Sequence, residues 1–203
     1  MIPSSEDFEQ LILEARNKYA EGNINHAIDC IEEAVHVTIK KPSNPDANAA
    51  AILDVVRMMM EDNNDDAAAA CLLNVNANLQ YFSPEVQALI CLKSGECYLS
   101  SQSFEHALNK FEQSRKIIEG CANMPQIVQA ELALARSEAL RQSGRAELAF
   151  VQLLAAYELY EQLNDITTAS KIKGYLREQL RKIDHSKRAE FLALADKVQD
   201  ALS

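Results

Sequence analysis

The sequence has few residues that break regular structure. Among its 203 residues there are five glycines, five prolines and no tryptophan. Glycine and proline disfavour helix interiors, so their scarcity beside abundant alanine, leucine, glutamate and glutamine predicts a mostly helical chain. Hydrophobic residues make up 48% of the sequence, which is enough for one sizeable domain with a continuous core. The composition therefore predicts an all-α fold.

Long hydrophobic runs are also missing. The longest plain apolar stretch, AAAACLL at residues 67–73, is far shorter than the roughly 20 residues that a membrane helix needs. The first ten residues, MIPSSEDFEQ, are acidic and lack the basic segment followed by an apolar one that marks a secretory signal. We therefore expect a cytoplasmic protein that has no membrane as a partner.

The cysteines show no pattern of disulfide or metal chemistry. Five of them cannot all pair within one chain, and none forms a CxxC. Cys91 and Cys97 are six residues apart, about 600° around a helix, so they point in different directions, whereas metal ligands must converge. We interpret the cysteines as small buried side chains in a reducing compartment. We expect no metal and no cofactor.

Positive charge is scarce over most of the chain. Residues 1–170 hold 12 Lys/Arg and 25 Asp/Glu, a net charge of −13, while residues 171–203 hold 8 and 5, a net charge of +3. An acidic body repels phosphate backbones, which argues against nucleic acid as a partner. The basic end fits either a solvated helix face or a contact with an acidic partner.

A helix-turn-helix pattern recurs along the chain. CYLSSQSFEHALNKFEQSRKI, residues 97–117, has the apolar spacing of two helices joined by a tight turn. Aligning the small residue that opens each second helix gives intervals of 42, 38, 42 and 40 residues; the aligned residues are Ala27, Ala69, Ala107, Ala149 and Ala189. Such a period is typical of a solenoid of helix pairs. We expect helices at 5–21, 24–40, 46–62, 64–80, 84–100, 104–119, 124–142, 146–163, 166–182 and 186–202. Because no linker divides them, residues 1–203 are predicted to form a single domain.

The third and fourth units carry a family pattern. The third has Gly95, Tyr98, Gln102, Ala107, Phe111 and Ser114; the fourth has Ser137, Leu140, Gly144, Ala149, Leu153 and Ala156. These spacings resemble the tetratricopeptide repeat (TPR), in a variant with a period near 40 residues. The resemblance implies a right-handed superhelix of five antiparallel helix pairs, although Lys18, Arg57 and Arg177 depart from the pattern in the other units. Another helix-pair solenoid and an irregular helical bundle are the alternatives.

The resemblance also implies a binding surface. In tetratricopeptide proteins the first helix of each pair lines a concave channel. The matching residues here are Arg16, Tyr19, Asp54, Met58, Glu61, Leu92, Glu96, Leu99, Leu134, Glu138, Arg141, Glu178 and Arg181. This mixed lining has apolar patches with more acid than base. It suits an extended or helical peptide with leucine-like anchors and some Lys or Arg. Alternatively, the chain's own C-terminal helix or a sister chain fills the channel, and the protein is a homo- or hetero-oligomer.

Sequence signatures of catalysis are absent. The chain contains no GxGxxG, GxxxxGK[ST], HExxH or GxSxG. His26 and His106 both directly precede an aligned alanine, which favours a structural role in the repeat. Met58–Met60 fits core packing, at least for Met60, or an adaptable binding surface. We interpret the chain as a non-catalytic adaptor that binds a protein segment. The alternatives are a constitutive scaffold subunit of a larger complex and a regulatory domain that senses a peptide or ligand.

Overall fold

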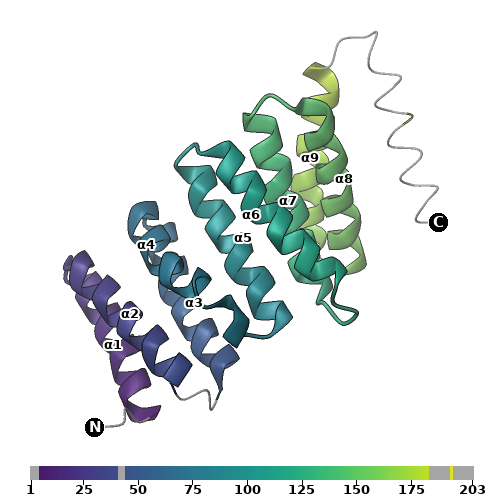
Figure 1. The fold of residues 1–203 in the computed structure, drawn as a ribbon. Helices are drawn as coiled ribbons and strands as arrows, with labels where there is room; N and C mark the ends of the chain where they lie inside the picture. Colours follow the sequence, from purple (N-terminus) through teal and green to yellow (C-terminus); the bar gives the residue numbers. More distant parts are fainter. Residues whose placement is uncertain (1–4, 41–43, 183–192, 194–203) are drawn as a thin grey trace. The chain divides into compact units, whose positions relative to one another are not determined.

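The computed structural model describes residues 5–40, 44–182 and 193, and all regular secondary structure in these ranges is helical (Figure 1). The elements are α1 (Ser5–Ala20), α2 (Ile24–Lys40), α3 (Pro45–Glu61), α4 (Asp65–Asn76), the short 3₁₀ helix η1 (Leu79–Tyr81), α5 (Pro84–Ser100), α6 (Phe104–Glu119), α7 (Gln126–Gln142), α8 (Ala146–Gln162) and α9 (Ile166–Lys182). The all-α prediction is confirmed for these residues. None of these helices combines the length and apolarity needed to cross a membrane.

The predicted helix boundaries agree with the structure to within two residues, except in the fourth helix. That helix was predicted over 64–80, but α4 ends at Asn76. The Asn76 amide donates to the Leu72 carbonyl at 2.8 Å, and the Asn78 amide donates to the Asn74 carbonyl at 2.9 Å. Such side-chain bonds compete with the backbone bonds that would extend the helix. The predicted helix over 186–202 lies outside the described residues.

The turns after α1, α3, α5 and α7 share one backbone geometry. Each has one residue with a positive φ; these are Gly22 (79°), Asn63 (58°), Gln102 (60°) and Gly144 (80°). The next backbone N–H then reaches back five residues: Asn23 donates to Lys18 and Arg145 to Leu140, both at 2.8 Å. This is the Schellman arrangement, which satisfies carbonyls at the end of a helix. These four turns recur about every 40 residues, near the period seen in the sequence, and the same geometry also follows α8 at Asn164 (57°), where Asp165 donates to Tyr160 at 3.0 Å.

The chain folds as two compact units, residues 1–103 and 104–203. In the first unit each helix packs against the next one, and α1 also contacts α3, α2 contacts α4, and α3 contacts α5. Alanines with no exposed surface recur in its core, including Ala15, Ala27 and Ala49, and they let helix backbones approach closely. In the second pair Ala68 is fully buried and the aligned Ala69 only partly. The register there differs by one residue from the sequence alignment.

Polar side chains tie the helices of the first unit together. The expected start of the helix over 84–100 is confirmed, and the Ser83 hydroxyl caps it by accepting from the Val86 N–H at 3.4 Å. The Ser83 N–H in turn donates to the Asp46 carboxylate at the start of α3, at 2.9 Å. The Asn48 amide donates to the buried Thr38 hydroxyl of α2 at 3.1 Å. The bond to Asp46 holds the starts of α3 and α5 together, and the bond to Thr38 ties α3 to α2.

In the second unit α7 packs against both α6 and α8, and α8 packs against α9. A buried apolar cluster from α7, α8 and α9 forms its core; the members are Ala130, Ala133, Phe150, Leu153, Ala156, Tyr160, Ala169, Ile172 and Leu176. Gln126 at the start of α7 donates to Gln162 at the end of α8, at 3.2 Å. The beginning of one helix therefore lies beside the end of the next.

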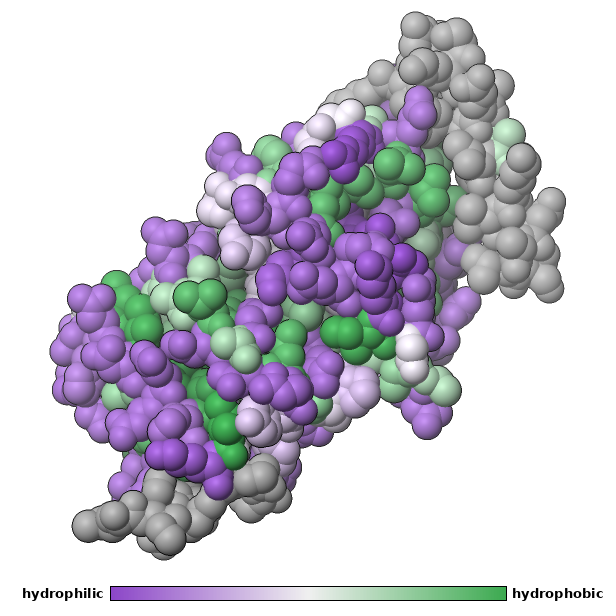
Figure 2. Space-filling model, viewed as in Figure 1, coloured by the Kyte–Doolittle hydropathy of each residue, from purple (hydrophilic) through white to green (hydrophobic). Residues whose placement is uncertain are grey.

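The surface is mainly polar on the face shown in Figure 2, with separate apolar patches between the hydrophilic residues. Large apolar side chains are exposed at Leu13, Leu73, Tyr81, Ile127, Leu148, Ile166 and Tyr175. Four of the cysteines are buried, and Cys121 is half-buried. Burial raises the pKa of the Cys71 and Cys97 thiols to about 12, so both stay protonated and unreactive near neutral pH. The expectation of buried, apolar cysteines is met at four positions.

Candidate partner-binding site

The predicted channel residues of the first unit lie on three helices that contact one another in the order α1, α3, α5. Tyr19, Met58 and Leu99 are half-buried, so each shows part of its side chain to solvent. Arg16 and Glu96 are also half-buried, while Asp54 and Glu61 are exposed; Leu92 has 0% exposure. A fully buried side chain offers no surface to a partner. We therefore remove Leu92 from the candidate site.

Each acidic residue of this predicted surface has a basic neighbour on its own helix. Arg57 lies 3.0 Å from the Asp54 carboxylate and 3.9 Å from that of Glu61. Lys93 donates to both carboxylate oxygens of Glu96, at 3.0 and 3.2 Å. Arg57 and Lys93 are not among the predicted channel residues, although their spacing of three or four residues from the acids is the signal for such pairs. The surface is therefore closer to neutral than predicted.

Tyr19 is held at the edge of this surface. Burial raises the pKa of its hydroxyl, and the charge of Asp62 raises it further. Asp62 follows α3 directly, so the Tyr19 side chain reaches from α1 to the turn between α3 and α4. The ring can offer its face to an apolar group while its hydroxyl stays hydrogen-bonded.

In the second unit, Glu138 and Arg141 form a hydrogen-bonded ion pair on α7. The Arg141 Nε donates to Glu138 at 2.7 Å, and the Gln142 amide adds a bond of 2.6 Å. The Arg141 bond lowers the pKa of the Glu138 carboxyl, and Glu138 together with the weaker charge of Glu178 raises the pKa of Arg141. Glu178 and Arg181 are exposed on α9. Leu134 is half-buried against the core of this unit.

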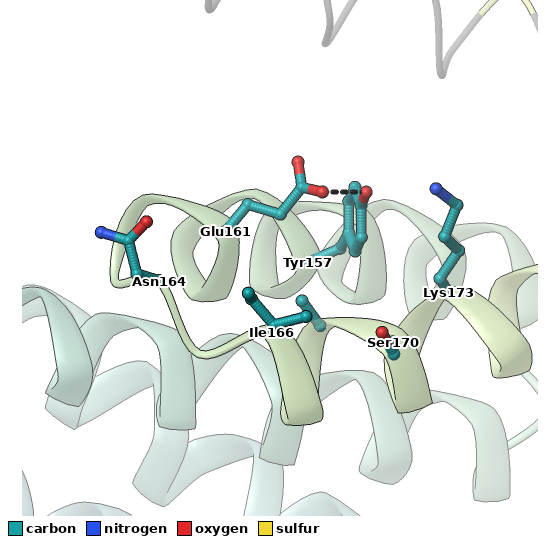
Figure 3. Close-up of a pocket in the computed structure, with 7 residues that line it drawn as sticks. Tyr157, Glu161, Asn164, Ile166, Ser170 and Lys173 are labelled. Carbon is teal, nitrogen blue, oxygen red and sulfur yellow. Dashed lines mark hydrogen bonds between the residues drawn. The ribbon is translucent and has the colours of Figure 1, made fainter.

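A groove between α8 and α9 was not expected from the sequence. It encloses about 370 Å³ and is lined by Tyr157, Glu161, Asn164, Ile166, Ala169, Ser170 and Lys173. Figure 3 shows Tyr157 and Glu161 on α8 across from Ile166, Ser170 and Lys173 on α9. The Tyr157 hydroxyl donates to Glu161, and Lys173 Nζ lies 5.8 Å from the centre of the Tyr157 ring. Ile166 is 76% exposed, so an apolar side chain of a partner would bury surface here.

A second groove is acidic and lies on α2, α4 and the residues that follow α4. It encloses about 450 Å³, and its lining is Asp29, Glu32, Glu33, Val35, His36, Ile39, Asn74 and Asn78. Three carboxylates stand within two turns of one helix. Neither helix belongs to the set that was predicted to line the channel.

Among the described residues, one group of side chains could hold a metal ion. Glu14, His26 and Cys30 bring their ligand atoms within 4.8 Å of one another, although no metal ligands are predicted from the sequence. No protein-family model matches the chain, and no curated protein matches it either.

Proposed function

We propose that the chain is a tetratricopeptide-like helical repeat, with five antiparallel helix pairs in a right-handed superhelix, that acts as a non-catalytic adaptor in the cytoplasm. The Schellman turns after α1, α3, α5 and α7 support the repeat, since these four recur at intervals near 40 residues; one further turn of this kind follows α8. The contacts of α1 with α3 and of α3 with α5 support stacking of the first helices of successive pairs.

One observation carries the proposed binding activity. Three half-buried side chains with large apolar surfaces, Tyr19, Met58 and Leu99, lie on three helices that touch in succession. A half-buried apolar side chain is held in place by its buried part while the rest remains available to a partner. Such anchors carry most of the energy of protein interfaces. We call Tyr19, Met58 and Leu99 the apolar row. It favours an extended or helical segment with apolar residues over a small polar ligand.

The charges around this row suit a partner with some basic residues. Surface ion pairs between neighbours on a helix are worth only about 0.3–0.5 kcal/mol, so an incoming Lys or Arg can displace Lys93 from Glu96 or Arg57 from Asp54. The exchange of one base for another gains little energy. The carboxylates around the row instead select against an acidic partner, because two carboxylates facing each other repel.

The test requires a partner, isolated with the full chain as bait from the native organism and identified by mass spectrometry. Leu99→Asp should weaken binding of that partner by about 2 kcal/mol or more, the scale of an interface anchor. Leu73→Asp is the matched control, since Leu73 is 68% exposed on α4, outside the proposed row. Circular dichroism verifies that both variants fold. Wild-type affinity in a folded Leu99→Asp variant would contradict the proposal.

The alternative of a constitutive subunit rests on the exposed apolar side chains. Ile166 and Tyr175 on α9 are 76% and 59% exposed, and in a permanent assembly a neighbour would cover them. This reading predicts that the isolated chain self-associates. Light scattering of the purified protein distinguishes the two functions: a concentration-independent monomer supports the adaptor, and concentration-dependent growth in mass supports the subunit.

A further inference from the structure

Three side chains with different donor atoms meet between α1 and α2. Glu14 comes from α1, and His26 and Cys30 come from α2. A carboxylate oxygen, an imidazole nitrogen and the thiol sulfur all lie within 4.8 Å of one another. His26 Nε2 and Glu14 Oε1 are already 3.0 Å apart. Among the described residues, no other set of three such groups converges in this way.

Local geometry explains why these residues meet. His26 and Cys30 are four residues apart on α2, which places them on the same helix face one turn from each other. The turn at Gly22 brings α2 back against α1. Ala15 and Ala27 directly follow Glu14 and His26 in the sequence and have no exposed surface. These small residues let the two helices approach closely enough for Glu14 to reach His26.

The charges around Cys30 are mainly negative. Glu14, Asp29 and Glu33 attract a positive ion to the sulfur, while Lys18 repels one. A divalent metal would displace the thiol proton and compensate these charges at once. Cys30 itself is 5% exposed, so the sulfur is shielded from bulk solvent on one side.

We propose that Glu14, His26 and Cys30 form a zinc(II) site that joins α1 to α2 and leaves one coordination position open. Oxygen, imidazole nitrogen and thiolate sulfur are the three donor types that zinc uses in proteins. Zinc bonds of about 2.0–2.3 Å in a tetrahedron place ligand atoms about 3.3–3.6 Å apart. The observed cluster reaches that spacing through side-chain rotation of the exposed Glu14 and His26. The fourth position takes water or a donor atom from a bound partner.

The competing interpretation is a simple surface pair between His26 and Glu14, whose side chains are 45% and 49% exposed. That pair needs no cysteine. The chain supplies a comparison within its own repeat: His106 occupies the same third position of α6 that His26 occupies in α2, but Lys110 stands four residues later instead of a cysteine. His106 therefore shares the place in the repeat, but no cysteine follows it four residues later.

Cobalt(II) is the probe, because it occupies zinc sites and a cobalt–thiolate bond gives a charge-transfer absorption in the near ultraviolet. We titrate the full chain with cobalt in the presence of a non-thiol reductant. One equivalent should produce the band, and one equivalent of zinc should remove it. Cys30→Ser should abolish the band. Glu14→Gln and His26→Gln should weaken cobalt affinity by roughly tenfold or more, whereas His106→Gln and Cys71→Ser should leave it unchanged.

Zinc should also raise the melting temperature of the wild-type chain, since a ligand that binds only the folded state stabilises it. At the same zinc concentration the rise should be smaller in His26→Gln, whose exposed position leaves the fold intact even if the buried Cys30→Ser does not fold. The proposal is overturned if the wild-type chain gives no thiolate band, if the band survives Cys30→Ser, or if His106→Gln weakens cobalt affinity as much as His26→Gln does. None of these readouts depends on partner binding.

Discussion

Replacing Gly144 and Gly174 by alanine should change stability in opposite directions. Gly144 has φ +80° in the turn after α7, and a Cβ built on it meets no atom within 4 Å. The loss in Gly144→Ala therefore comes from the backbone alone, because the left-handed conformation costs an L-residue about 1–2 kcal/mol. Gly174 lies inside α9, where a Cβ also meets nothing within 4 Å. Alanine there should gain about 0.5–1 kcal/mol.

The assay is thermal and urea unfolding of the full chain, followed by circular dichroism. For a chain of this length, 1 kcal/mol corresponds to about 2–4 °C in Tm, so the two variants should melt on opposite sides of the wild type. Gly144→Asn is the matched control. Asparagine occupies the same backbone conformation at Asn63 and Asn164, so it should lose less than alanine. A Gly144→Ala protein as stable as the wild type would refute the shared turn geometry on which the repeat rests.

Three further predictions concern the second unit. Ala149→Trp should lose about 1–3 kcal/mol or more, because Ala149 is fully buried and overpacking strains the core; Leu148→Trp, at an exposed neighbour, should melt like the wild type, and equal melting of both variants would show that the repeat register is wrong. Ile172→Ala, which empties a buried site on α9, should lose about 2–5 kcal/mol in urea unfolding; a negligible loss would mean that α9 does not complete this core. Asp165 accepts bonds from the hydroxyl and N–H of Thr168, at 2.6 and 3.0 Å, and they lower its carboxyl pKa. Its stabilising effect should be present above about pH 3.9 and be lost as the pH falls through the lower folded-state pKa; an Asp165→Asn variant with an unchanged acid unfolding curve would contradict this.

Local signals were sufficient to predict most of the helices. The start of α5 could be read from Ser83, Pro84 and Glu85, because a capping hydroxyl and a first-turn proline act within four residues. The end of α4 could not be read from apolar spacing, since asparagine side chains interrupt the helix there without changing its periodicity. The predicted single domain over 1–203 stays a prediction.

The candidate site was less accessible from sequence than the helices. Placing Tyr19, Met58 and Leu99 on neighbouring helices needed a family resemblance, because no local rule says that α1 touches α3. Leu92 was assigned to the surface although the fold buries it. The meeting of Glu14 with His26 depends on how α1 is rotated against α2. A helical period fixes the spacing within α2 but not that rotation. The cluster therefore could not be predicted from the sequence alone.

The location of charge decides how a partner of the proposed kind would be recognised. The chain has a net charge of −10, yet Asp54, Glu61 and Glu96, on the same helices as the proposed row, are each paired with a base on their own helix. The carboxylates of α2 instead line the acidic groove, which contains no residue of the row. The field of exposed charges acts over roughly a Debye length of 8–10 Å and mainly speeds encounter, while desolvated apolar anchors set the lifetime of a complex. For a basic segment the acidic groove would then govern the association rate, and the apolar row would govern dissociation. The two contributions come from different helices of the first unit, so salt should change the first and leave the second nearly untouched.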